Sequence, residues 1–427
     1  MSSNMRPQVK EFEKLQFKMP RLVDAGRGIP LYLYTGSVQD VSRIDLIFQT
    51  GAYEQKAPLV AQAAAEALIE ASVRKSFGVV SELFDFYGGW VRKIVSLHYT
   101  IFTLYSPNRT FRRLVPLFFE VITSPRFSKK DLERFKRQGR ESLKVNQKKV
   151  ESISSTIFKS KMFGDHPYGV TPTLEDYDAL CVDSIKEYAL EGFVSEKCQV
   201  IFSGDVNEEM IKLLIENLQR IKSSASVAET KYEIGGTPPK GLVLEEVKNA
   251  LQSSVRIGAR TINRGDENYM NLHILNSLLG GYFGSRLNKN IREEKGYTYG
   301  INSWLIGLPD AAYFTISSHT AIRFTAPLIE EVKNEIEKIK SSLVSDEELQ
   351  ILKGFLLGDF ARMFDNAFTL ADNFIAVLTN DVPMNYYDIR IEHIKNATPQ
   401  LMLKTAQEYL PAFEDMTVVV AGGLEGK

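Results

Sequence analysis

The sequence is poor in the residues that zinc and disulfide chemistry need. Its 427 residues include only two cysteines, Cys181 and Cys198, and five histidines, of which the closest two, His273 and His319, are 46 residues apart. Two cysteines without a C-x-x-C motif support neither a disulfide framework nor a thiolate zinc site, and we expect both to be buried thiols. No helix can present two of the histidines one turn apart, which excludes the H-E-x-x-H and H-x-x-E-H metal motifs.

Long apolar runs and an excess of charge are also missing. No run approaches the roughly 18 apolar residues of a membrane span, and the N-terminal MSSNMRPQVKEFEKLQF has no signal-peptide core. The 52 basic and 53 acidic side chains cancel to a net charge of −1, so no global field favours nucleic acid or anionic lipid. The basic stretch 129–149 is interpreted as the solvated face of a helix. We therefore expect a cytoplasmic protein without nucleic-acid or membrane partners.

Several catalytic motifs are absent from a chain of ordinary globular composition. Apolar residues make up 44% and charged residues 25% of the sequence, which excludes disorder, collagen and coiled coil as descriptions of the whole chain. No G-x-S-x-G, Walker A or G-x-G-x-x-G motif occurs, so serine hydrolases, nucleotide hydrolases and dinucleotide enzymes have no support. The glycines of 280–284 are interpreted as a hinge or a close backbone approach rather than a phosphate loop.

Landmarks of the first half recur in order in the second half. The strand-like segment Ser42–Phe48 has a counterpart 211 residues later at Ser253–Ala259. Three further pairs follow: helices opened at Pro116 and Pro327, serine N-caps of long helices at Ser128 and Ser345, and closing apolar strands at 199–204 and 417–422. This order predicts one α+β domain repeated twice in tandem.

The boundaries of the two repeats follow from composition. Residues 222–241 are rich in serine, glycine and proline, as is typical of a linker. We therefore assign residues 1–221 to the first repeat and residues 242–427 to the second. Each repeat is expected to form an antiparallel-type sheet packed with helices.

One segment of the second repeat combines side chains that could contact a peptide. Its helix is expected to end at Gly296 and to turn directly into a strand over Tyr297–Trp304, so that Arg292 and Tyr299 flank one corner. A guanidinium and a phenol at one corner can hold a peptide carbonyl or stabilise an oxyanion. The alternative is a commonplace arginine in a last helical turn beside a commonplace strand tyrosine.

The same segment carries a resemblance to a known family. GYFGSRLNKNIREEKGYTY, residues 281–299, resembles the C-terminal-half signature of the pitrilysin/insulinase-like inverted zinc metallopeptidases, which include the mitochondrial processing peptidase and the core proteins of respiratory complex III. Further first-half landmarks agree at 51–54, 88–89, 165–169 and 203–206. The resemblance implies an inverted-zincin fold of the LuxS/processing-peptidase type. It also implies that Arg292 and Tyr299 bind substrate peptide, with main-chain addition to a sheet edge as the mode of binding.

The chain departs from the family at the metal-binding helix. By the resemblance, the H-x-x-E-H helix corresponds to Pro58–Ala71, which places Ala63 and Ala67 at the two histidine positions and Glu66 at the general base. Alanine suits a helix interior, so these replacements preserve the fold while they delete the chemistry. We expect Glu66 to be a vestigial carboxylate on the helix surface, paired with nothing essential.

The third metal ligand of the family is missing as well. The distal glutamate falls on Ser142, or on Glu141 if the register slips by one, and another acidic position falls on Phe135. A zinc site needs about three protein ligands and an open position for water. We therefore expect this chain to bind no zinc.

The combination of one intact and one erased motif leads to a functional hypothesis. Some family members are heterodimers in which one chain carries the metal motif and the other supplies the arginine and the tyrosine. By that resemblance, this chain is a peptide-binding, non-catalytic subunit whose partner is a homologous H-x-x-E-H zinc peptidase; a homodimer is a further option. The alternatives are a purely structural subunit like the core proteins and a self-sufficient enzyme with an unrecognised site.

Overall fold

The computed structural model describes residues 15–224 and 231–424. Residues 1–14 and 425–427, at the outer ends of the predicted repeats, and residues 225–230 of the predicted linker lie outside the described residues. No helix in the described ranges is both long and apolar enough to cross a membrane.

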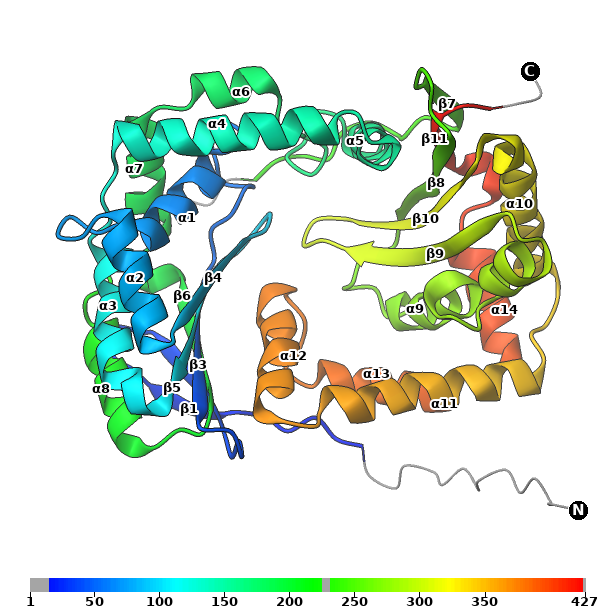
Figure 1. The fold of residues 1–427 in the computed structure, drawn as a ribbon. Coiled ribbons are helices and arrows are strands. Elements are labelled where there is room, and N and C mark those ends of the chain that lie inside the picture. The colour runs from blue at the N-terminus through cyan, green and yellow to red at the C-terminus, as the bar shows by residue number, and fades with distance from the viewer. Residues whose placement is uncertain (1–14, 225–230, 425–427) are drawn as a thin grey trace, which may run out of the picture.

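Two sheets organise the described chain (Figure 1). The first contains β1 (Arg21–Asp24), β2 (Pro30–Thr35), β3 (Val41–Phe48), β4 (Trp90–Val95), β5 (Thr100–Pro107) and β6 (Cys198–Gly204). The second contains β7 (Gly241–Glu246), β8 (Gln252–Thr261), β9 (Thr298–Gly307), β10 (Ala312–Ala321) and β11 (Thr417–Gly422). Their spatial orders are β1-β2-β6-β3-β5-β4 and β7-β11-β8-β10-β9, and only the β2–β6 and β7–β11 pairs are parallel among the described strands.

Helices fill the rest of both halves. Those of the first half are α1 (Val60–Glu70), α2 (Phe77–Tyr87), α3 (Phe111–Thr123), α4 (Lys129–Asn146), α5 (Val150–Phe163), α6 (Leu174–Ala179), α7 (Val182–Gly192) and α8 (Glu208–Leu218). Those of the second half are α9 (Tyr269–Asn276), α10 (Thr325–Ser341), α11 (Asp346–Met363), α12 (Ala367–Thr379), α13 (Tyr386–Asn396) and α14 (Pro399–Tyr409). Two π-helical turns, η3 (Ser277–Gly281) and η4 (Asn288–Glu294), lie between α9 and β9. The α+β fold with two helix-packed sheets is confirmed.

The repeated landmarks and the expected burial of the two cysteines hold in the structure with two exceptions. The predicted strands are β3, β8, β6 and β11, and the hydroxyls of Ser128 and Ser345 accept hydrogen bonds from the third residues of α4 and α11. The first exception is Pro116, which lies inside α3 and does not open it, because the buried face of this helix starts at Phe111 and outweighs the one lost backbone bond. The second is Cys181, which is an exposed thiol, whereas Cys198 is buried as expected.

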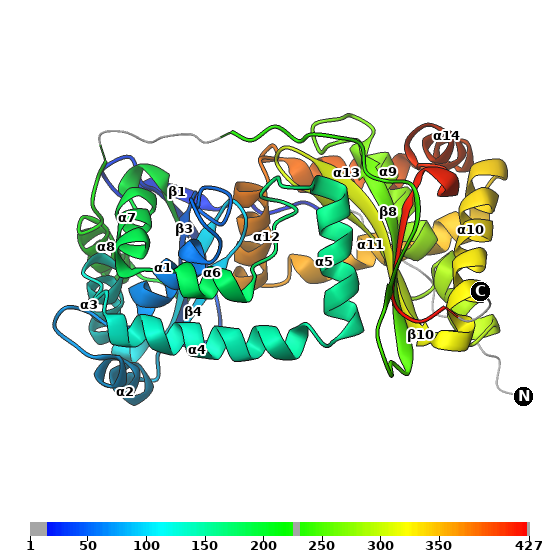
Figure 2. The ribbon, with the colours of Figure 1, turned by 90° about the horizontal axis from the view of Figure 1, so that it is seen from above.

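Each sheet is covered on one face by a helix from the other half. On β3, Leu46 packs among first-half helices, whereas Ile47 on the opposite face packs in the cluster that contains Phe374 of α12. Similarly, α5 of the first half lies on β8 and β11, where the Ser154 and Ser254 hydroxyls are 2.8 Å apart. Figures 1 and 2 show α12 beside the first sheet and α5 beside the second. The two halves therefore share their cores.

A buried ion-pair network fixes α12 on the first sheet. Arg43 of β3 is 1% exposed, and its guanidinium lies 2.7 Å from the Asp45 carboxylate and 2.8 Å from that of Asp372 on α12. Thr103 donates a further hydrogen bond to Asp45 over 2.7 Å. Burial raises the pKa of Asp45, and the charge of Arg43 opposes this effect. The arginine thus joins a strand of one half to a helix of the other.

A second joint lies at the tip of the β9–β10 hairpin. The Tyr168 hydroxyl donates to the Asp310 carboxylate over 2.9 Å and lies 2.8 Å from Nε2 of His98, which follows β4. The ring of Tyr53 packs against His98 with centroids 4.4 Å apart. This contact holds the hairpin of the second sheet against loops of the first half.

Replacing Arg43 tests the network. Arg43→Met should lower the free energy of unfolding by about 3–5 kcal/mol, because it leaves the buried Asp45 carboxylate without its counter-charge. Urea unfolding followed by circular dichroism measures the change. The control, Arg21→Met, removes an exposed pair with Glu208 and should cost at most about 1 kcal/mol. A loss no larger than that of the control would contradict the proposed importance of the buried pair.

Candidate functional site

The helix that corresponds to the family's metal helix packs against three elements of the first half. α1 follows Leu59, which adopts a left-handed conformation at φ 71°, and its alanines allow close approach to α3, α7 and the edge strand β4. Ala63 is buried, and Ala67 and Glu66 are half-buried. The two alanines and the glutamate that the sequence placed together therefore line one face of one helix.

Glu66 is paired, contrary to the expectation of a carboxylate that pairs with nothing essential. Its carboxylate meets the ammonium of Lys93 on β4, and the two side chains are 28% and 25% exposed. Burial lowers the pKa of Lys93. Sequence reasoning missed this lysine because β4 lies beside α1 only in the folded chain. The available signal was a single lysine on the half-buried face of an alternating strand, between Val91 and Val95.

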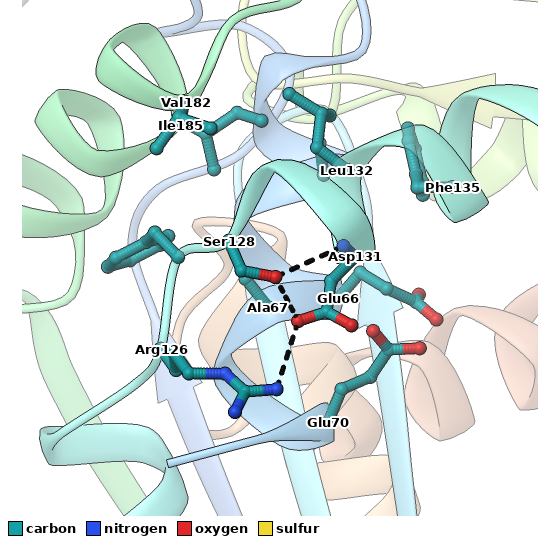
Figure 3. Close-up of a pocket in the computed structure, with 12 residues that line it drawn as sticks. Glu66, Ala67, Glu70, Arg126, Ser128, Asp131, Leu132, Phe135, Val182 and Ile185 are labelled. Carbon is teal, nitrogen blue, oxygen red and sulfur yellow. Dashed lines mark hydrogen bonds and ion pairs between the residues drawn. The ribbon is translucent and has the colours of Figure 1, made fainter. Parts of the chain in front are cut away.

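Two further carboxylates line the same small cavity, whose volume is about 30 Å³ (Figure 3). Glu70 of α1 pairs with Arg134 of α4, and burial raises the pKa of Glu70 against the charge of that arginine. Asp131 lies 3.0 Å from Arg134 and 3.4 Å from Arg126. Burial acts to raise the pKa of Asp131, but the hydrogen bond from Ser128 and the charge of Arg134 outweigh it and lower the pKa. The cavity holds a few water molecules at most.

The donor set of this pocket does not fit zinc. Phe135 and the side chains of Leu132, Val182 and Ile185 line the wall opposite α1. Ser142 and Glu141 are exposed further along α4 and do not line the pocket, and Glu141 binds Lys144 over 2.8 Å. Within residues 15–224 and 231–424, no three His, Cys, Asp or Glu side chains are grouped so that they could hold a metal ion. The carboxylates that are present already have cationic partners, and no nitrogen or sulfur ligand accompanies them.

The arginine and tyrosine of the second half lie at an open corner. The Tyr297 N–H donates to the Ile291 carbonyl over 3.0 Å, and Gly296 at φ 67° makes the turn between η4 and β9. Tyr299 is 96% exposed at the start of β9. The Arg292 guanidinium lies 4.3 Å from the centre of the Phe283 ring, which is itself 65% exposed.

The two sets of predicted site residues belong to different halves. α1 lies with the first sheet and β9 with the second (Figure 1). No interaction within the described residues joins Arg292 or Tyr299 to the pocket of Glu66. The structure therefore brings Ala63, Glu66 and Ala67 together in one place and Arg292 and Tyr299 in another.

Comparisons with known proteins agree with the resemblance. The family model described as "Peptidase M16 inactive domain" matches residues 180–356. An uncharacterized zinc protease of Mycobacterium leprae is 25% identical over 286 residues, which cover 65% of this chain and 64% of that protein. The non-peptidase homolog YmxG of Helicobacter pylori is 21% identical over 305 residues, which cover 70% of this chain and 68% of that protein. The match thus spans just under two thirds of the mycobacterial relative.

A solved structure shares the fold over almost the whole chain. The crystal structure of a peptidase M16 inactive domain from Pseudomonas fluorescens has a TM-score of 0.82 to this chain at 19% identity, and the match covers 96% of this chain and 99% of that one. These matches agree with the resemblance to the pitrilysin/insulinase-like metallopeptidases: the chain is similar to M16-family proteins, some of which are described as inactive, and it shares their fold.

Proposed function

We propose that the chain is the peptide-binding subunit of a heterodimeric zinc metallopeptidase, and that it supplies Arg292 and Tyr299 to a zinc site on a homologous H-x-x-E-H partner. The observation that carries the proposal is that Tyr299 is exposed and Arg292 is only half-buried. A phenol that is 96% exposed and a guanidinium held only against an exposed phenylalanine have no polar partner among the described residues. Exposed aromatic and arginine side chains are typical of the central contacts of an interface.

The ion pairs in the first-half pocket support the proposal that the zinc ion is bound by a partner subunit. Its carboxylates are neutralised by basic side chains of the protein, and its alanines offer no metal ligand. Among the described residues, no group of metal ligands therefore accompanies the pair of the second half. A partner with the intact motif would provide the zinc, and this chain would provide the donors that hold the peptide.

The edge of the second sheet supports binding of extended peptide. β9 is the last strand of its sheet and pairs with β10 on one side only. An extended peptide can add to such an edge through main-chain hydrogen bonds. Tyr299 and the half-exposed Trp304 both belong to β9. A peptide on this edge would thus pass the same corner as Arg292.

A purely structural subunit remains the competing candidate. It would have the same exposed corner but would bind no peptide. We also propose residence in the cytoplasm, and recovery of the native protein from the periplasmic or secreted fraction would contradict that part.

Arginine replacement tests the catalytic contribution. The purified chain is mixed with an H-x-x-E-H homologue encoded in the same genome, and zinc-dependent cleavage of fluorogenic peptides is measured. Arg292→Ala should lower turnover by about 10- to 100-fold, because one charged donor to the peptide or the oxyanion is lost. The control is Arg323→Ala, since Arg323 also lies over an aromatic ring, at 4.7 Å from the centre of Phe324. Unchanged turnover with Arg292→Ala would show that the assigned role is wrong.

The two tryptophans of the chain report which sheet edge binds peptide. Trp90 lies on β4 and Trp304 on β9, and both are about half exposed. Adding tryptophan-free peptides from a casein digest should shift the fluorescence of the native chain and of Trp90→Phe, because Trp304 lies on the binding edge. Trp304→Phe should abolish most of the shift. A shift that depends on Trp90 would move the site to β4, and no shift in any variant would favour the structural subunit.

A further inference from the structure

The carboxylates that line the pocket between α1 and α4 are matched by three basic side chains, of which Arg126 lines the pocket and Lys93 and Arg134 do not. Three carboxylates line it, those of Glu66, Glu70 and Asp131. Each meets a basic side chain of this chain: Lys93 for Glu66, Arg134 for Glu70, and both Arg134 and Arg126 for Asp131. The three negative charges therefore face three positive ones. To bind these carboxylates, a divalent cation would have to break their ion pairs with lysine and arginine side chains.

Lys93 is the ion-pair partner of Glu66 in this arrangement. It projects from the edge strand toward α1, on the same face of β4 as Val91 and Val95, which pack into the core of the first half. An ammonium on that half-buried face is costly unless a counter-charge meets it. Glu66 is the carboxylate that meets it, at the position where the resemblance implies the general base. The small side chains of Ala63 and Ala67 line the same pocket.

We propose that this pocket carries its own cations where the family holds a metal, with Lys93 as the counter-ion of Glu66. Lys93 also acts as a positioning residue, because the pair fastens the edge strand β4 to α1. The pocket then binds a divalent cation only weakly even when histidines are introduced at positions 63 and 67. The Lys93 ammonium repels the metal ion and already forms an ion pair with the Glu66 carboxylate. The proposal concerns only the first half and does not depend on peptide binding by Arg292 and Tyr299.

Restoring the histidines with and without the lysine tests the proposal. The full chain is prepared as Ala63→His/Ala67→His and as Ala63→His/Ala67→His/Lys93→Met, and zinc binding is measured by equilibrium dialysis with metal analysis. The triple variant should bind zinc at least about tenfold more tightly than the double variant, which corresponds to about 1.4 kcal/mol of relieved repulsion. Equal affinity in the two variants, or no binding by either, would overturn the proposal.

A matched control separates the role of Lys93 from a general change of charge. Lys75 forms a comparable half-buried pair with Glu120 in the same half, at 2.6 Å, and Glu120, unlike Glu66, does not line the pocket. Ala63→His/Ala67→His/Lys75→Met should bind zinc as weakly as the double variant. Tighter binding in this control as well would mean that net charge, and not the position of Lys93, excludes the metal.

A second measurement keeps the proposal testable if histidine at the buried position 63 prevents folding. Glu66→Gln, Lys93→Met and the double variant Glu66→Gln/Lys93→Met leave the alanines in place. Each single change should lower the urea midpoint of unfolding, and the double variant should lose clearly less than the sum of the two, because the neutral side chains no longer leave a charge unpaired. Strictly additive losses would show that the two side chains are not coupled, and the proposal would fail.

Discussion

The burial of both faces of each sheet is the constraint on which the rest of the structure depends. The central strands β3 and β8 have buried residues on both faces, and a sheet of this kind must be covered twice. The helices of one half cover only one face of its own sheet. The second face is covered by α12 in the first sheet and by α5 in the second, each supplied by the other half. Neither half can therefore complete its core alone.

The fold around α1 does not depend on a metal ligand in this helix. α1 packs against α3, α7 and β4, its buried residues are Val60, Leu68 and four alanines, and Glu66 pairs with Lys93 of β4. Alanine at positions 63 and 67 has the highest helix propensity and occupies little space. The frame of the molecule is set by the sheet coverage and by Arg43, so the chemistry of α1 can change without moving the second half.

Much of the fold could be predicted from local patterns, whereas the pairing of distant elements could not. The strands β3 and β8 and the caps Ser128 and Ser345 each depend on a short stretch of sequence, and the structure has them where the pattern indicated. Pro116 was misplaced because its local rule was overridden by the long buried face of α3. The exchange of α5 and α12 leaves no local signal, since an amphipathic helix does not specify which sheet it will cover.

The candidate site shows the same division between local and distant information. The resemblance to a known family singled out positions 63, 66 and 67 on one helix, and the corner at Gly296 follows from the helix stop, so both were accessible from the sequence. The pairing of Glu66 with Lys93 joins elements that are 27 residues apart and required the structure. Phe135 lines the pocket and Ser142 does not, and this could be known only from the path of α4 in the structure.

The pair of Glu66 and Lys93 bears on why a half-buried carboxylate is stable in a helix that contains no histidine. A half-buried carboxylate without a counter-charge would be destabilising, so removal of a metal from such a pocket leaves two stable outcomes: loss of the carboxylate or gain of a fixed cation. In this chain a fixed basic side chain accompanies Glu66, and basic side chains also accompany Glu70 and Asp131. A fixed ammonium also ties a strand to a helix, which a freely exchanging metal ion does only while it is bound. The carboxylates of the first-half pocket are thus matched by basic side chains of the protein, while the second half leaves Tyr299 exposed on the edge strand β9 and the half-buried Arg292 of η4 against Phe283.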